Sequence, residues 1–254
     1  MKVTFLGTGT SQGVPVISCE CKVCKSTDPR DNRLRTSVLF SWENLNIVVD
    51  AGPDFRQQML RKEVKQLDAI LITHEHNDHI IGLDDIRPFN FMNKAELLVF
   101  ASAHVQKDLR KRFEYIFDKN PYPGAPSIKF SSIINDQTIE IKGQKFIPIK
   151  VDHGGVEVFG FRVGDFAYIT DAKSIDSKEV EKLKGVKKLV VNALHKMPHH
   201  SHFNLEEALQ FIKKVGPEEA YITHISHSMG SHQKTSLELP KNIHLAYDGL
   251  CLKL

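Results

Sequence analysis

The chain has 254 residues, of which 41% are hydrophobic and 26% are charged, a balance typical of globular proteins and not of disordered ones. A formal net charge of +3 is close to neutral and does not indicate a surface that binds nucleic acid. No apolar run approaches the roughly 20 residues that span a bilayer. The opening MKVTFLGTGTSQG lacks the apolar core of a signal peptide, so we expect a cytoplasmic protein with one domain over residues 1–254.

The first half of the chain alternates strand-like and helix-like patterns. Runs rich in β-branched and aromatic residues predict strands at residues 2–6, 37–42, 45–50, 69–73 and 96–102. Helical patterns cover residues 51–63, 83–87 and 103–117. Pro88 should end the second of these helices, because proline lacks an amide hydrogen and clashes with the preceding turn. Residues 120–127, with the sequence NPYPGAPS, predict a surface loop.

The second half opens with strands and then alternates strands with helices. The strand patterns lie at residues 128–133, 138–143, 145–151, 156–164, 166–170, 187–192, 219–223, 243–247 and 250–254. Helices are predicted at residues 177–185 and 204–216, the second with Asn204 as its N-cap. The pattern favours two sheets packed face to face with helices outside, although layer rules alone do not separate this from other α/β arrangements.

The segment from His74 to His79, with the sequence HEHNDH, carries the strongest chemical signal. It directly follows the buried strand at residues 69–73, and the loops at the carboxyl ends of such strands are where α/β proteins place ligand sites. Three imidazoles and a carboxylate suit zinc or manganese. On a loop, His74, His76 and His79 can converge on one ion while Asp78 faces a second.

This segment resembles the HxHxDH signature of the metallo-β-lactamase superfamily. The other motifs of that superfamily can be placed in order, each after a predicted strand, at Asp50, His153, Asp171 and His224. The resemblance implies an αββα sandwich of two mixed sheets with helices on the outer faces. It further implies that two divalent ions, zinc or manganese, are held in one active site.

The same resemblance assigns the ligands. By the family pattern, one ion is held by His74, His76 and His153, and the other by Asp78, His79 and His224. Asp171 bridges the two ions, and Asp50 orients a ligand histidine from behind.

Three clustered cysteines indicate which branch of the superfamily the sequence resembles. Cys19, Cys21 and Cys24 form a CxCxxC pattern, which in a reducing compartment favours a metal site over disulfides. A structural zinc ion needs four ligands, and His227, three residues after His224, is the candidate fourth. CxCxxC with this late histidine resembles the PhnP branch of cyclic phosphodiesterases. The segments LGTGTSQGVP, DAGPDFR and GLDDIRPFNF also resemble that branch, and the first also resembles the tRNA 3′-processing endonucleases.

His202, in HHSHFNLEEAL, occupies a position where the PhnP branch carries a histidine that binds phosphate or protonates the leaving oxygen. Its neighbours His199 and His200 leave that role open among the three. Asp78 or Asp171 is expected to orient the attacking water.

The sequence therefore predicts a metal-dependent hydrolase, a phosphodiesterase whose substrate the resemblance suggests is a small cyclic ribose phosphate. Alternatives are a ribonuclease like RNase Z, a thioesterase or lactonase on the same fold, and a metal-binding protein without turnover. We expect no membrane partner, and the sequence leaves open whether the protein is a homodimer.

Overall fold

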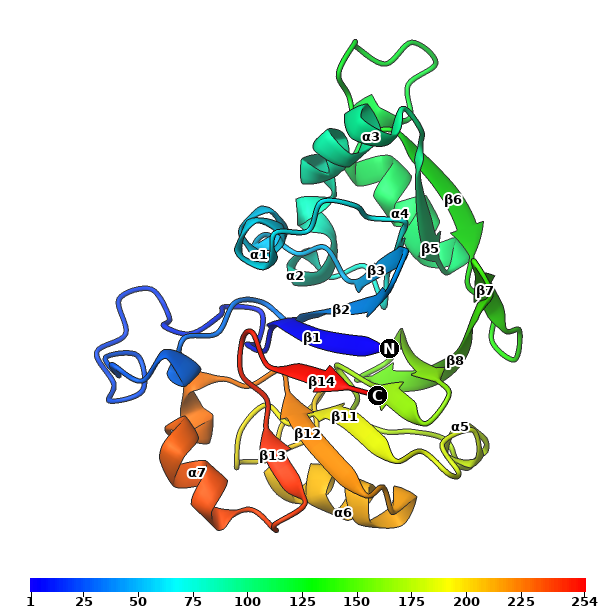
Figure 1. The fold of residues 1–254 in the computed structure, drawn as a ribbon. Helices are drawn as coiled ribbons and strands as arrows, with labels where there is room; N and C mark the ends of the chain where they lie inside the picture. Colours follow the sequence, from blue (N-terminus) through cyan, green and yellow to red (C-terminus); the bar gives the residue numbers. More distant parts are fainter.

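The computed structural model describes residues 1–254 as two seven-stranded sheets with helices outside them (Figure 1). The first sheet has the order β14 (Cys251–Lys253), β1 (Lys2–Gly7), β2 (Ser37–Trp42), β3 (Leu45–Val49), β4 (Ala69–Leu71), β5 (Leu97–Ala101) and β6 (Ile128–Ser132). The second sheet has the order β13 (Ile243–Leu245), β12 (Glu219–Thr223), β11 (Lys188–Asn192), β10 (Phe166–Tyr168), β9 (Val156–Val163), β8 (Gln144–His153) and β7 (Ile139–Ile141).

Both sheets are mixed. In the first, strands β14 to β3 pair antiparallel and strands β3 to β6 pair parallel. In the second, β13 to β10 pair parallel and β10 to β7 pair antiparallel. The parallel strands of each sheet have their carboxyl ends along one edge, and these edges carry most of the predicted site residues.

Alternation along the strands separates three apolar layers. In β2, Val38 and Phe40 pack between the sheets, whereas Leu39 packs on the outer face. Residues from both sheets meet in the central layer, where Phe161 and Tyr168 are fully buried. Side chains that alternate in this way give each strand two buried faces, which is why its sequence reads as a nearly continuous apolar run.

Helices cover the two outer faces. The first sheet is covered by α1 (Phe55–Lys62), α2 (Asn77–Ile80), α3 (Arg87–Asn93) and α4 (Ala103–Arg112), and the second by α5 (Ser177–Glu181), α6 (Leu205–Val215) and α7 (His232–Glu238). Short 3₁₀ turns lie at η1 (Pro29–Asp31), η2 (Ile81–Ile86), η3 (Glu114–Ile116) and η4 (His227–Met229). The predicted αββα sandwich of two mixed sheets is confirmed.

Three local predictions were wrong or incomplete. Pro88 does not end a helix but lies in the first turn of α3, where the missing amide hydrogen has no helical partner to lose. The predicted helix at residues 103–117 ends at Arg112 and continues as η3. Helix α7 was not predicted, because its sequence HQKTSLE buries only His232 and Thr235 and shows little apolar periodicity.

Asn204 caps α6 as predicted, and its side chain accepts from the amide of Glu207 while Glu207 returns a bond to the amide of Asn204. None of the helices is both long and apolar enough to traverse a lipid bilayer. The assignment of residues 1–254 to a single domain stays a prediction.

Candidate metal centre

The predicted site residues converge where the two sheets present their strand ends. Asp50 follows β3, and the segment His74–His79 follows β4 and leads into α2. From the second sheet, His153 ends β8, Asp171 follows β10, and His224 follows β12. The structure thus brings together, from both sheets, every active-site residue that the sequence singled out: Asp50, His74, His76, Asp78, His79, His153, Asp171, His202 and His224.

The backbone is strained at three of these positions. Asp50, Asp171 and His224 have φ angles of 65°, 56° and 55°, in the left-handed region that non-glycine residues seldom adopt. Asp50 and His224 directly follow a strand and Asp171 lies three residues after one, so the chain turns sharply to present each side chain at the sheet edge. Such strain, on the order of 1–3 kcal/mol per residue, is typical of functional sites.

Gly52 lets two of the site segments approach closely. A Cβ on Gly52 would lie 2.9 Å from the carbonyl carbon of Asp78 and closer still to its oxygen. Gly82 similarly packs its Cα against the carbonyl oxygen of Gly52, and its amide donates to Ala51 at 2.8 Å. The turn that carries Asp50 therefore rests directly on the segment that carries Asp78.

The ligand-type atoms form overlapping groups with metal-site spacing. His74, His76 and His153 make one group, and Asp78, His79 and His224 make another. Asp171 lies between them: its Oδ2 is 3.4 Å from His79 Nε2, and its Oδ1 is 3.1 Å from His224 Nε2 and 4.0 Å from His153 Nε2. This is the arrangement that two ions sharing Asp171 would need.

Hydrogen bonds behind the rings fix which nitrogen faces the centre. His79 Nδ1 lies 2.7 Å from Asp50 Oδ2, and His153 Nδ1 donates to the carbonyl of Ser201 at 2.6 Å. Asp50 is itself held by the amide and hydroxyl of Thr73, at 2.9 and 3.0 Å. With Nδ1 engaged, Nε2 of each ring is directed to the centre, as in metal sites whose ligand histidines are oriented by an outer partner.

Buried charge is concentrated here. Burial by itself would lower the pKa of His79, but the carboxylates of Asp78, Asp171 and Asp50 outweigh it and hold that pKa well above its usual range. Burial would raise the pKa of Asp171, yet the surrounding imidazoles, His224 foremost, lower it. Burial lowers the pKa of His74 well below its usual range, which leaves a neutral imidazole. Three carboxylates in a buried pocket call for positive counter-charge.

Unpartnered atoms show that the residues fit metal ions. Nε2 of His74, His79 and His224 is buried without a hydrogen-bond partner. Buried polar atoms are almost always paired, because an unpaired one costs about 1–3 kcal/mol. Neutral imidazoles and carboxylates at this spacing are the donor set that zinc and manganese accept.

His202 lies on one side of this centre. Its ring is 4.5 Å from the ring of His153 and 4.7 Å from that of His224, and its Nδ1 is 3.7 Å from Asp171 Oδ1. That nitrogen is buried without a hydrogen-bond partner. Of the three histidines between which the sequence could not choose, His202 is therefore the one that reaches the centre.

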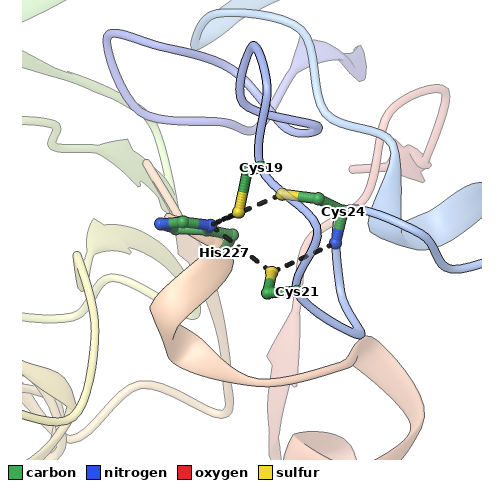
Figure 2. A group of neighbouring side chains, drawn as sticks. All are labelled: Cys19, Cys21, Cys24 and His227. Atoms are coloured by element: carbon green, nitrogen blue, oxygen red, sulfur yellow. Dashed lines mark hydrogen bonds between the residues drawn. The ribbon is translucent and has the colours of Figure 1, made fainter.

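The cysteines form a second cluster (Figure 2). Cys19, Cys21 and Cys24 surround Nδ1 of His227, with sulfur–nitrogen distances of 3.3, 3.5 and 3.4 Å. Tetrahedral zinc with ordinary Zn–S and Zn–N bonds places its sulfur and nitrogen ligands about 3.5 Å apart. The amide of Cys24 lowers the pKa of Cys21 to about 6, whereas burial raises that of Cys24 to about 11. The four predicted residues fit a structural zinc ion.

Sequence reasoning missed the residues that support the site. Gly52 and Gly82 gave no signal except their place beside the site motifs, because a close backbone approach is a tertiary property. Ser201 accepts one hydrogen bond from His153, and Thr73 holds Asp50 through two, from its amide and its hydroxyl. Only the position of Thr73, directly before His74, hinted at a role.

Comparison with known proteins agrees with this geometry. Residues 45–225 match a family model described as a beta-lactamase superfamily domain, and that span covers most of the chain. The chain belongs to the β-lactamase superfamily. Within this metallo-β-lactamase fold it also belongs to the PhnP family: a crystal structure of "a new diphosphatase from the PhnP family" superimposes with a TM-score of 0.93 at 40% identity, covering 100% of this chain and 97% of that chain. The predicted family is thereby confirmed.

Two other similar proteins differ in sequence identity and in the share of their length that the chain covers. A protein of Porphyromonas gingivalis (strain ATCC BAA-308 / W83) named octanoyltransferase is 40% identical over 252 residues, which is 98% of this chain but 51% of that protein. The chain thus spans about half the length of this curated relative. Zn²⁺-bound PqqB from Methylobacterium extorquens superimposes with a TM-score of 0.82, covering 100% of both chains, but at 18% identity it shows a shared fold only.

Proposed function

We propose that this member of the metallo-β-lactamase hydrolases is a metal-dependent phosphodiesterase. The observation that carries the proposal is the convergence of two ligand groups on Asp171, with buried ring nitrogens that have no hydrogen-bond partner. His202 supplies a further nitrogen beside that carboxylate. A non-catalytic metal-binding protein would have no need of this additional histidine.

Each residue has a role in the proposal. One ion is held by His74, His76 and His153, the other by Asp78, His79 and His224, and Asp171 is shared. Zinc and manganese both suit this set. Two such ions, when bound, polarise a phosphoryl oxygen and lower the pKa of water. Cys19, Cys21, Cys24 and His227 hold a structural zinc ion.

The remaining three roles belong to hydrogen-bonding groups. The Asp78 carboxylate, whose Oδ2 lies 3.2 Å from His79 Nε2, orients the attacking water. His202 donates a hydrogen bond to the phosphate or to the departing oxygen, a contribution worth roughly 10²–10⁴-fold where a proton is transferred. Asp50 positions His79 and touches no substrate.

The substrate we propose is a small disubstituted phosphate. Family resemblance points to a cyclic ribose phosphate, and the PhnP-family structure described as a diphosphatase points to a phosphoric anhydride. In both, the site would receive a phosphorus atom that carries ester or anhydride oxygens, one of which departs on hydrolysis.

A second candidate is hydrolysis of an acyl thioester. The observation that favours it is the octanoyltransferase name of the Porphyromonas gingivalis relative, of which this chain matches about half. The match covers 51% of that protein, so the name describes a chain about twice as long as the matched part.

The test begins with protein stripped of metal and reloaded separately with manganese or zinc. Turnover of bis(p-nitrophenyl) phosphate is measured beside hydrolysis of an octanoyl thioester. The variants are Asp171→Ala, His202→Ala and, as a matched control, His244→Ala, which removes an exposed imidazole on β13.

We expect metal-dependent turnover of the phosphodiester that Asp171→Ala abolishes, that His202→Ala strongly reduces, and that His244→Ala leaves at the wild-type rate. Thioester hydrolysis without phosphodiester turnover would contradict the phosphodiesterase proposal and support the second candidate, an acyl thioester hydrolase. Protein that binds two ions yet turns over neither substrate would contradict both.

A further inference from the structure

The segment between β11 and α6, residues 194–203, forms a closed loop that we call the histidine loop. Its base is joined by the amide of Leu194 and the carbonyl of Phe203, 3.0 Å apart. The amide of Phe203 donates to the carbonyl of Ala172, next to Asp171, and the amide of Ser226, two residues after His224, donates to the carbonyl of Leu194. The loop is thus hydrogen-bonded to the segments that carry Asp171 and His224. Its backbone is therefore held in place relative to the metal centre.

His199 in this loop has a fixed hydrogen-bonding state. Its Nδ1 accepts from the amide of Ser201 at 3.3 Å, and the Ser201 hydroxyl lies 3.4 Å away. The carbonyl of Ser201 accepts from His153. Because Nδ1 is an acceptor, the ring proton is on Nε2. All hydrogen bonds of His199 use Nδ1, so its Nε2–H remains available as a donor.

The rings continue outward from the metal centre. His202 lies against His153 and His224, and the ring of His199 lies 5.1 Å from that of His202. His202 is buried, His199 is half-buried, and the exposed ring of His200 lies 4.4 Å from His199. The Nε2–H donor of His199 therefore lies beyond the ring of His202, which is the histidine proposed to contact the reacting phosphate. His199 is thus one ring farther from Asp171 than His202 is.

The chemistry of the loop favours an anion. Its ten positions, LHKMPHHSHF, include four histidines and a lysine and no acidic residue. Lys196 pairs with Glu238 outside the loop, so the imidazoles are the free donors. A neutral imidazole N–H binds a phosphoryl oxygen strongly, because the hydrogen bond is charge-assisted.

We propose that His199, with His200 beside it, forms a second oxyanion subsite on the leaving-group side of the centre. This inference rests on the proposed function. The subsite accepts a phosphoryl group attached to the departing oxygen, so it selects substrates with two phosphoryl groups, such as a diphosphate, over simple diesters.

Two amide substitutions separate binding from positioning. The amide nitrogen of glutamine lies as many bonds from Cα as Nε2, so His199→Gln keeps the outward donor and loses the contact to Ser201. The amide oxygen of asparagine lies as many bonds from Cα as Nδ1, so His199→Asn keeps the acceptor for Ser201 and loses the outward donor. His199→Leu removes both, and His244→Gln is the matched control on β13.

Calorimetry measures the affinity of each manganese-loaded protein for methylenediphosphonate and for inorganic phosphate, after metal content and thermal unfolding have been checked. The readout is the ratio of the two dissociation constants. We expect His199→Leu and His199→Asn to reduce the preference for the diphosphonate by about tenfold to a hundredfold, the effect of losing a hydrogen bond to a charged group. His199→Gln and His244→Gln should retain that preference.

The opposite pattern, with asparagine retaining the preference and glutamine losing it, would show that His199 only positions Ser201 and His153. An unchanged ratio in His199→Leu would show that no anion reaches the ring. Both results overturn the subsite while phosphodiester turnover continues. Absence of turnover in the wild-type protein is a separate failure, that of the proposed function.

Discussion

The close approach at Gly52 predicts that Gly52→Ala damages the metal centre without touching a ligand. The added Cβ would be 2.9 Å from the Asp78 carbonyl carbon and nearer to its oxygen, whereas ordinary contacts begin at 3.4 Å. The Asp78 backbone must then retreat by about 1 Å, a displacement that in an active site costs on the order of 10²-fold in rate. Forcing an extra methyl into a packed site also costs about 1–3 kcal/mol of stability.

The assay compares metal affinity by calorimetry, turnover of bis(p-nitrophenyl) phosphate, and thermal unfolding with and without chelator. The control is Gly164→Ala, at the turn between β9 and β10, where a Cβ meets nothing within 4 Å and only the left-handed φ of 56° is strained. We expect Gly164→Ala to lose stability alone. If Gly52→Ala binds metal and turns over substrate like the wild type, the close approach does not position Asp78 and the reasoning is refuted.

Three further substitutions test other parts of the structure. Asp50→Asn keeps the shape of the side chain but removes the charge behind His79, so calorimetry should show metal affinity lower by about 10–100-fold, and an unchanged affinity would count against an orienting role. Cys21→Ser should lower zinc content by about one ion per chain in elemental analysis and reduce the unfolding temperature, whereas equal zinc content would exclude the cysteine cluster as a zinc site. Phe161→Ala leaves a cavity between the sheets and should destabilise the fold by about 3–5 kcal/mol in urea unfolding, with smaller values indicating a core that collapses around the gap.

The site was more predictable than the local structure around it. His74, His76, Asp78 and His79 are contiguous in sequence and follow a strongly apolar strand, so their proximity required no knowledge of the fold. Asp171 and His224 were placed by motif order and by their position after strands.

Other features depend on contacts that a single sequence does not reveal. The fixed proton of His199 follows from a hydrogen bond to Ser201, and the need for glycine at position 52 follows from the carbonyl of Asp78. Pro88 was misinterpreted because proline interrupts a helix when it lies in the helix interior but is favoured in the first turn of a helix, where Pro88 lies. Helix α7 lacks apolar periodicity because few of its residues are buried.

The metal centre is divided between the sheets: Asp50 and the His74–His79 segment come from the first, and His153, Asp171 and His224 from the second. In the proposed ligand sets each ion takes ligands from both sheets, so ion binding would be thermodynamically linked to the association of the two sheets. Metal ions would then add to the free energy that holds the two sheets in their folded arrangement. A chain without the ions would keep the apolar layer and the hydrogen bonds between the sheets, such as that from the Phe159 amide to the Thr73 carbonyl, and would lose the part of its stability that ion binding supplies.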